Sequence, residues 1–251
     1  MAAYTAWGMS KQFRLYRAQP KGYVWLLGGA FTMGLGIWAM HFIAMLAYQL
    51  PIPVAYNLEA TLISVLPAIL ASFAAIYLLS YEQVKTPAFI LGGLIFGLGI
   101  SVMHYSGMAA MQVDAQMWYD KTIFILSVIL GILFSYLALG LNYLANRYKD
   151  SSAYTQIKLL SVSLVAVAIS AMHYMGMAAM HFLPNLGPPK NIQGLDPISL
   201  SLLVIIITSF IMGLGILTSL FQQRLIGAYQ NADASQERLR NAINSISDGI
   251  A

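Results

Sequence analysis

Three of the four histidines in this sequence occur in copies of one short motif. His41, His104 and His173 each follow a methionine, and a second methionine comes four residues after each of them. The copies read WAMHFIAMLAY at 38–48, SVMHYSGMAAM at 101–111 and SAMHYMGMAAM at 170–180. Residues four apart lie on the same face of a helix, so each copy would present one imidazole and one thioether to the same place.

These side chains define a candidate metal site. The candidate ligands are the three histidines, the methionines four residues after them (Met45, Met108 and Met177) and the methionines directly before them (Met40, Met103 and Met172). The preceding methionines are turned about 100° away on a helix, so we expect them to share the centre less readily. Met111 and Met180 are expected to extend the same helix face by a further turn, and His181 is either an accessory ligand or a structural residue at a loop edge.

Imidazole and thioether ligands together favour copper, especially Cu(I). The chain has no cysteine, which excludes thiolate ligands, disulfides and cysteine catalysis. Zinc could bind the histidines but would gain little from the methionines. The competing interpretation is structural, because methionine fills gaps in apolar cores and histidine in a membrane helix often hydrogen-bonds to a neighbouring helix. Three copies at equivalent helix positions favour a shared ligand over that interpretation.

The composition is that of a polytopic membrane protein. Of the 251 residues, 59% are hydrophobic and 9% are charged, whereas about 25% are charged in soluble proteins. The mean hydropathy is +0.71. The net charge of +4 is interpreted as an orientation signal, because basic residues at the ends of apolar segments set membrane topology. We therefore expect a lipid bilayer as a partner and no nucleic acid.

Six apolar segments are long enough to cross the hydrocarbon core as helices. They lie near 23–48, 58–80, 87–111, 121–146, 155–181 and 198–223. The N-terminal AAYTAWGMS is similar to the ends of the second and fourth segments, so we expect the chain to begin inside a further helix whose first half is absent. The predicted fold is all-α: a transmembrane helix bundle with six full spans, a truncated preceding helix and three repeated helix pairs.

The basic residues orient this arrangement. Eleven of the 13 lysines and arginines fall on one side, and only Lys121 and Lys190 fall on the other. By the positive-inside rule the first side, which includes the C-terminus, is cytoplasmic. The motif histidines then lie toward the outer ends of three parallel helices, about 10 Å from the helix end for His41. Copper, or a diatomic gas dissolving in lipid, could reach that depth from outside.

The three M-H-[YF]-x-[GA]-M strings at the outer ends of alternating helices resemble the MHYT sensor domain of the bacterial inner membrane. The resemblance extends from the first helix to about Leu225. It implies that the histidines and methionines of the motif bind copper and that the domain senses oxygen, carbon monoxide or nitric oxide. Ala44 stands where the other copies have Gly107 and Gly176, and we expect altered packing beside His41 without loss of a ligand.

The resemblance also implies the domain organisation. Residues 1–225 would form the sensor domain, and residues 226–251 a cytoplasmic signalling helix that leads into a PAS-like output domain outside this sequence. Such output modules make or degrade cyclic di-GMP, so this segment is expected to have no enzyme activity, and the parent protein could carry diguanylate cyclase or phosphodiesterase domains. Small residues in the tail follow a weak heptad spacing. This spacing suits either a solvated amphipathic helix or a coiled coil between two chains, and we expect a homodimer.

Three alternatives compete with a gas or copper sensor. A copper transport or delivery protein is one, although no ladder of histidines and methionines continues to the cytoplasmic side. A membrane enzyme is another, but the sequence shows no acid–base pair, nucleophile or phosphate loop to support it. A heme held by two histidines is a chemical variant of the sensor, because histidine and methionine both bind heme iron.

Overall fold

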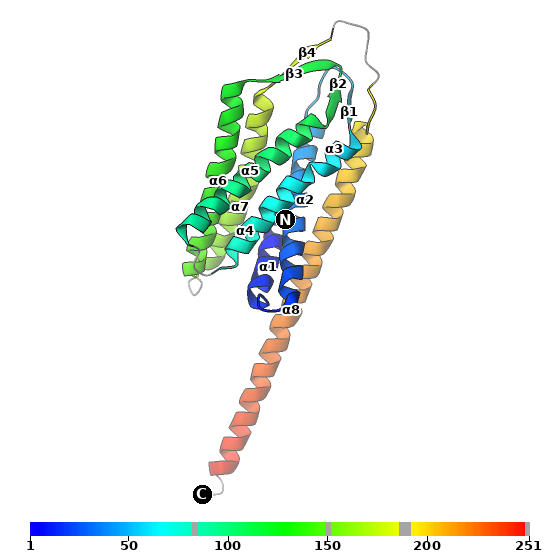
Figure 1. Cartoon of the computed structure of the whole chain (residues 1–251). Helices are drawn as coiled ribbons and strands as arrows, with labels where there is room; N and C mark the ends of the chain where they lie inside the picture. The colour runs from blue at the N-terminus through cyan, green and yellow to red at the C-terminus, as the bar shows by residue number, and fades with distance from the viewer. Residues whose placement is uncertain (82–84, 149–151, 186–191, 249–251) are drawn as a thin grey trace.

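The computed structural model describes the chain except for residues 82–84, 149–151, 186–191 and 249–251. It is a bundle of helices with short paired strands at one end (Figure 1). In chain order the elements are α1 (Ala2–Leu15), α2 (Pro20–Ala47), β1 (Val54–Tyr56), α3 (Leu58–Ile63), α4 (Val65–Leu79), α5 (Thr86–Ala109), β2 (Met111–Val113), β3 (Ala115–Tyr119), α6 (Lys121–Arg147), α7 (Tyr154–Ala178), β4 (Met180–Pro184) and α8 (Pro197–Asp248).

Six helical segments are long and apolar enough to cross a membrane, which confirms the predicted all-α bundle with six full spans. They are Pro20–Ala47, Leu58–Leu78, Thr86–Ala109, Lys121–Ala145, Tyr154–Ala178 and Pro197–Thr218. Some of these helices begin with residues that favour helix initiation. A proline lies in the first turn of α2 and of α5, where its missing N–H costs no helical hydrogen bond. Asp120 caps α6 by accepting a hydrogen bond from the Ile123 N–H at 2.9 Å.

The second predicted span, 58–80, is interrupted at Ser64, where α3 ends and α4 begins. Pro67 explains the interruption, because its ring has no N–H to bond the carbonyl of residue 63 and crowds that carbonyl. Trp38 of α2 stabilises the break from the side. Its indole N–H donates to the Thr61 carbonyl at 2.8 Å and lies 3.1 Å from Ser64 Oγ.

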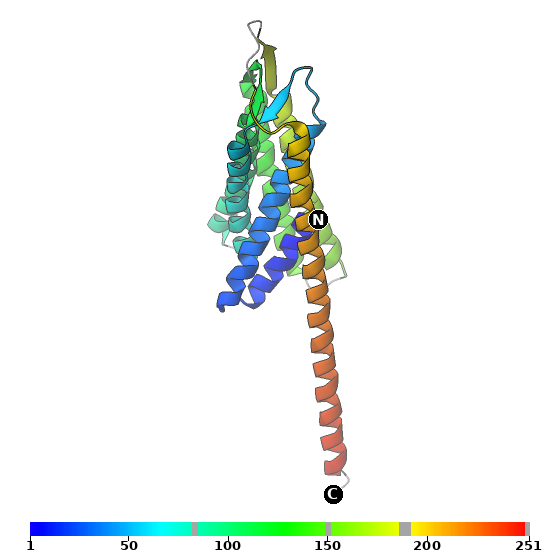
Figure 2. The ribbon, with the colours of Figure 1, turned by 90° about the vertical axis from the view of Figure 1, so that its right-hand side faces the viewer.

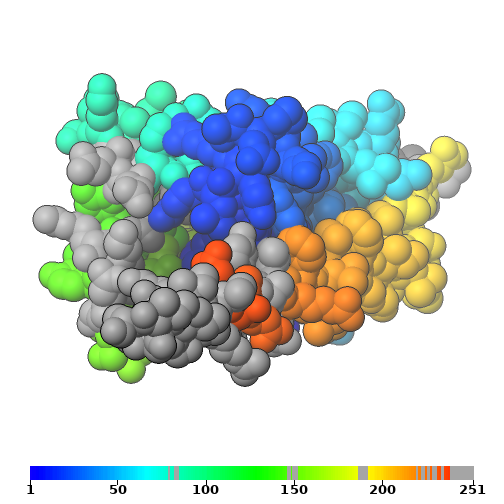
Figure 3. Space-filling model, turned by 90° about the horizontal axis from the view of Figure 1, so that it is seen from below, coloured from blue at the N-terminus to red at the C-terminus, as the bar shows by residue number. Residues whose placement is uncertain are grey.

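The three histidine-bearing helices α2, α5 and α7 contact one another in the centre of the bundle. Helix α4 packs against α2 and α5, α6 packs against α5 and α7, and α1 and α8 both pack against α2. Figures 1 and 2 show that α8 continues as one helix far beyond the other helices. Seen from that end, the blue N-terminal segment lies beside the orange part of α8 (Figure 3). Helices α2, α5 and α7 end at the opposite end of the bundle, next to the strands that follow them.

Two of the predicted helices are shorter than expected, and strands follow them. Helix α5 ends at Ala109 rather than residue 111, and α7 ends at Ala178 rather than residue 181. Strand β1 pairs antiparallel with β2, and β3 pairs antiparallel with β4. These strands have three to five residues. They tie the loops after the three motif helices to each other at the end of the bundle opposite the tail of α8 (Figure 1).

Glycines repeat in the packing as they do in the sequence, which supports the predicted helix-pair repeat. Gly34 of α2 packs against the backbone of Ile69, and Gly97 of α5 packs against the backbone of Ile132. Each glycine lies seven residues before a motif histidine. A Cβ at either position would lie 2.5 Å from an atom of the isoleucine, so only glycine lets the helices approach so closely.

Helix α8 runs without interruption from the membrane span into the tail. The predicted boundary between residues 225 and 226 lies inside this helix, and the division of the chain into a sensor domain and a signalling helix stays a prediction. Because the helix is continuous, a displacement of the last span would also displace the tail.

Candidate metal centre

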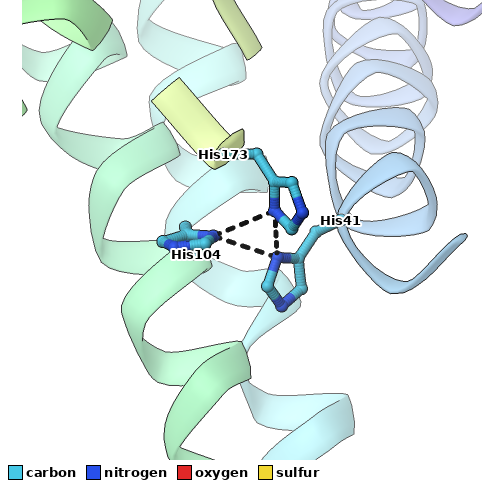
Figure 4. Close-up of side chains that lie close together, drawn as sticks. All are labelled: His41, His104 and His173. Atoms are coloured by element: carbon cyan, nitrogen blue, oxygen red, sulfur yellow. Dashed lines mark hydrogen bonds between the residues drawn. The ribbon is translucent and has the colours of Figure 1, made fainter. Parts of the chain in front are cut away.

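The three motif histidines meet in the interior of the bundle, between α2, α5 and α7. The Nδ1 atoms of His41 and His173 lie 3.1 Å apart, those of His41 and His104 lie 3.1 Å apart, and those of His104 and His173 lie 3.2 Å apart (Figure 4). Their side chains are 0%, 1% and 2% exposed for His41, His104 and His173. In the described part of the chain, they are the one group of three or more histidines and acidic residues that could hold a metal ion.

The planes of the three imidazole rings are steeply inclined to one another. Their centroids are 4.9 to 5.1 Å apart, and their planes cross at 77° to 89°. Each ring therefore points one nitrogen at a common centre without stacking on its neighbours. Because the three helices carry the same motif at the same depth, the arrangement follows from the repeat itself.

Protons alone cannot satisfy the three Nδ1 atoms. In neutral imidazole each Nδ1 is either a hydrogen-bond donor or an acceptor. Among three atoms that all contact one another, at least two must have the same role, so one contact pairs two lone pairs or two N–H groups. Burial makes an unsatisfied contact costly. A cation at the centre removes the conflict, because all three nitrogens can then direct lone pairs at it.

The dimensions of the triangle fit a metal ion. Its centre lies about 1.8 Å from each nitrogen, and metal–imidazole bonds are about 2.0–2.1 Å long. A metal ion would therefore be held by the Nδ1 atoms of His41, His104 and His173. Three protein ligands are typical of metal sites that also bind a small exogenous ligand.

Glycines of the motif make room for the histidine rings. A Cβ on Gly107 would lie 2.5 Å from His41 Nε2, and a Cβ on Gly176 would overlap the ring of His104. The glycine three residues after one histidine therefore contacts the histidine of the preceding copy. Altered packing of Ala44 beside His41 stays a prediction. Ala44 is half-buried, whereas Gly107 and Gly176 are buried.

The nitrogens that point away from the centre differ between the copies. The Nε2 atoms of His41 and His104 are buried and have no hydrogen-bond partner among the residues that the structure describes. With Nδ1 bound to a metal, these Nε2 atoms would carry the ring protons. The two rings are thus held by packing against glycine rather than by a polar neighbour.

Most of the predicted methionine ligands are buried in the apolar core of the bundle. Met45, Met103, Met108, Met172 and Met177 belong to the apolar core at 0% to 8% exposure, and Met40 packs against it half-buried. Their assignment as metal ligands stays a prediction. The expectation for Met111 and Met180 is wrong, because both lie on strands rather than on the extended helix face.

His181 does not join the cluster. It lies exposed on β4, and its ring stacks on Trp118 of β3 with centroids 4.3 Å apart. Of the two roles left open for it, the structural one at the loop edge agrees with this position.

The residues that directly follow the histidines have unequal surroundings. Tyr105 lies 2.6 Å from Ser127 Oγ of α6, Phe42 is fully buried, and Tyr174 is 66% exposed. Sequence reasoning did not find the contacts of Gly107 and Gly176 with the histidines. Their position three residues after each histidine was the signal that could have indicated them.

The fold and the cluster define a multi-pass membrane domain in which repeated helices each contribute one histidine to a shared centre. Residues 34–92 and 97–153 match the MHYT family, described as "Bacterial signalling protein N terminal repeat". The chain belongs to this family, and its third motif copy lies beyond the two matched segments. No solved structure matches the chain.

Relatives along almost the whole chain are bacterial signalling proteins. The bifunctional diguanylate cyclase/cyclic di-GMP phosphodiesterase MucR of Pseudomonas aeruginosa is 37% identical over 226 residues, which is 90% of this chain and 32% of MucR. The cyclic di-GMP phosphodiesterase NbdA of the same species is 38% identical over 218 residues, 86% of this chain and 27% of NbdA. The signaling protein YkoW of Bacillus subtilis is 27% identical over 230 residues, 92% of this chain and 29% of YkoW. The chain spans about a third or less of these relatives.

Proposed function

We propose that this chain is the membrane sensor domain of a cyclic di-GMP signalling protein, and that copper held by His41, His104 and His173 is its sensing centre. The mutual contact of the three Nδ1 atoms supports a metal most strongly, because no set of tautomers satisfies all three pairs. The relatives support the signalling role, since MucR and NbdA are named as enzymes of cyclic di-GMP.

Copper is the metal that the surroundings favour. Each of the three motif copies contributes buried methionines to the apolar core of the bundle, and thioethers select Cu(I) over harder ions. Met45, Met108 and Met177 are the methionines from which we expect a further ligand. A metal held by three histidines would retain the capacity to bind oxygen, carbon monoxide or nitric oxide, and the metal itself is the other candidate signal.

The geometry argues against heme. Two histidines on opposite faces of a heme iron are separated by two bonds of about 2 Å each, whereas every nitrogen pair in this cluster lies 3.1 to 3.2 Å apart. The cluster also occupies one end of the bundle, since His41 comes six residues before the end of α2. A transport route would need further sites along the bundle, and the described residues contain no second group of histidines and acidic residues.

The signal would leave through α8. With the C-terminus in the cytoplasm, as the positive-inside rule predicts, the histidine cluster lies near the outer surface and the tail enters the cytoplasm. The output domains of the parent protein would follow the tail, and a dimer of tails would carry the signal. A ligand can shift such a domain only by binding one helix arrangement more tightly than another.

Metal analysis of the purified protein tests the proposal. We expect about one copper per chain after loading with Cu(I), and loss of that copper in His104→Ala. His181→Ala is the matched control, because His181 is exposed and lies outside the cluster. Equal copper in His104→Ala and wild type, or a protein that stays metal-free after loading, would reject the proposal. A Soret band in the optical spectrum would assign the centre to heme instead.

A further inference from the structure

Two buried ring contacts lead from the histidine cluster to the outer strands. The His41 and Phe42 rings meet edge to face with centroids 4.7 Å apart, and the Phe42 and Tyr56 rings meet edge to face at 6.0 Å. Phe42 is 0% exposed and Tyr56 is 3% exposed. Because close-packed side chains transmit displacement, a movement of the His41 ring reaches β1 through Phe42.

Tyr56 is bonded to the segment that begins α8. The Tyr56 N–H donates to the Leu195 carbonyl at 2.8 Å, and the Leu195 N–H donates to the Tyr56 carbonyl at 2.8 Å. Leu195 lies two residues before Pro197, the first residue of α8. Between them Asp196 accepts a hydrogen bond from the Ser199 N–H of the first turn. Two backbone hydrogen bonds thus tie the start of α8 to β1.

The backbone next to this bridge requires glycine. Gly194 has φ +158°, and a Cβ at this position would lie 2.5 Å from the Tyr56 carbonyl oxygen. A side chain would therefore meet both an unfavourable backbone conformation and an acceptor of the bridge. The bridge can form only because residue 194 has no side chain.

A pocket beside the bridge gives it room to move. The pocket has a volume of about 540 Å³, and its lining includes Met45, Tyr56 and Pro197. Packed interiors switch between discrete arrangements rather than deforming continuously. Tyr56 of β1 and Pro197 at the start of α8 both border this open volume and are not packed on that side.

We propose that Phe42, Tyr56 and Leu195 form a clasp that couples the histidine cluster to α8 through the outer strands. Binding of a metal or a ligand at His41 shifts Phe42 and Tyr56, and the two hydrogen bonds to Leu195 carry the shift to the outer end of α8. The clasp rests on the proposed function, because it needs a ligand at the cluster. It acts in addition to the side-by-side packing of α2 and α8.

Hydrogen exchange on the 251-residue chain in detergent tests the clasp, with Ag(I) as a redox-inert probe for Cu(I). We expect Ag(I) to change the exchange rate of the Leu195 amide by about three-fold or more in the wild type. Gly194→Ala should abolish that change while the Ag(I) content and the response around His41 remain. Gly213→Ala is the matched control on α8, because nothing lies within 4 Å of its Cβ position. Phe42→Leu breaks the ring contacts without touching the bridge and should have the same effect as Gly194→Ala.

The outcomes separate the clasp from the metal site. If both Gly194→Ala and Phe42→Leu keep the full response at Leu195, the signal travels through the packing of α2 and α8 and the clasp is rejected. A wild type that binds Ag(I) without any change at Leu195 also rejects it. A wild type that binds no Ag(I) at all overturns the proposed function, and the clasp with it, and metal analysis alone shows this result.

Discussion

The ring of His104 lies against the Cα of Gly176, in the space that a methyl group at residue 176 would occupy. The same relation joins His41 to Gly107. The motif glycine therefore serves the histidine of the preceding copy and not its own. Within the motif, histidine and glycine are two halves of a contact that forms only between copies.

This contact predicts that Gly176→Ala disturbs the metal centre without removing a ligand. The added methyl group must displace the His104 ring, and overpacking of this kind costs about 1–3 kcal/mol. We expect a lower melting temperature and reduced copper content after loading. Gly140→Ala is the control, because its Cβ would meet only Phe89, at 3.9 Å. Wild-type copper content in Gly176→Ala would contradict the contact.

Removal of the metal should destabilise the bundle. A ligand that binds only the folded state at about 100 times its dissociation constant adds about 2.7 kcal/mol to the free energy of unfolding. We expect copper-loaded protein to melt higher than chelator-treated protein, measured by thermal unfolding in detergent. In His173→Ala the two melting temperatures should coincide. A persistent difference in that variant would mean that copper acts outside the cluster.

Trp38→Phe should weaken the junction of α3 and α4. The indole N–H donates to the Thr61 carbonyl, and Trp38 is 1% exposed. The Ser64 hydroxyl also donates to this carbonyl, at 2.7 Å, so the substitution removes one of its two side-chain hydrogen bonds, with an expected cost of about 0.5–1.5 kcal/mol. Trp118→Phe serves as the control, because Trp118 is 53% exposed. Equal melting temperatures of the two variants would show that the Trp38 hydrogen bond does not stabilise the break.

Asn142→Leu should be destabilising because of Lys158. The Lys158 Nζ donates to Asn142 Oδ1 at 2.8 Å, and the lysine is 2% exposed. Replacing the amide removes an acceptor from a buried ammonium group, with an expected cost of about 1–3 kcal/mol. The double variant Asn142→Leu with Lys158→Met should recover much of this loss, since it removes both partners. No recovery would mean that Asn142 contributes through packing alone.

Stability should depend on pH through Tyr56. Burial raises the pKa of its phenol to about 12. Tyrosine in the unfolded chain loses its proton near pH 10, so between pH 10 and about 12 the folded state binds more protons than the unfolded state. The free energy of unfolding therefore falls as pH rises through this window. Tyr56→Phe should reduce the slope, measured by denaturation at several pH values. An unchanged slope would contradict the raised pKa.

The sequence predicted the spans and the meeting of the histidines for the same physical reason. Long apolar segments define membrane helices, and equal motif positions on parallel helices place His41, His104 and His173 at one depth. The break at Ser64 was missed, although Pro67 signals it, because the surrounding hydropathy is uninterrupted. The short strands were missed because Met111 and Met180 continue the apolar pattern of the helices before them. Contacts between copies, such as His104 with Gly176, depend on the rotation of helices about their axes, which spacing alone does not fix.

The contacts between copies limit how independently the three repeats can vary. Gly107 fits against the His41 ring and Gly176 against the His104 ring, so a larger residue at either glycine acts on a histidine of another repeat. The repeats are therefore interlocked and are not three separate modules, and a tolerated change in one of them requires an adjustment in the copy before it.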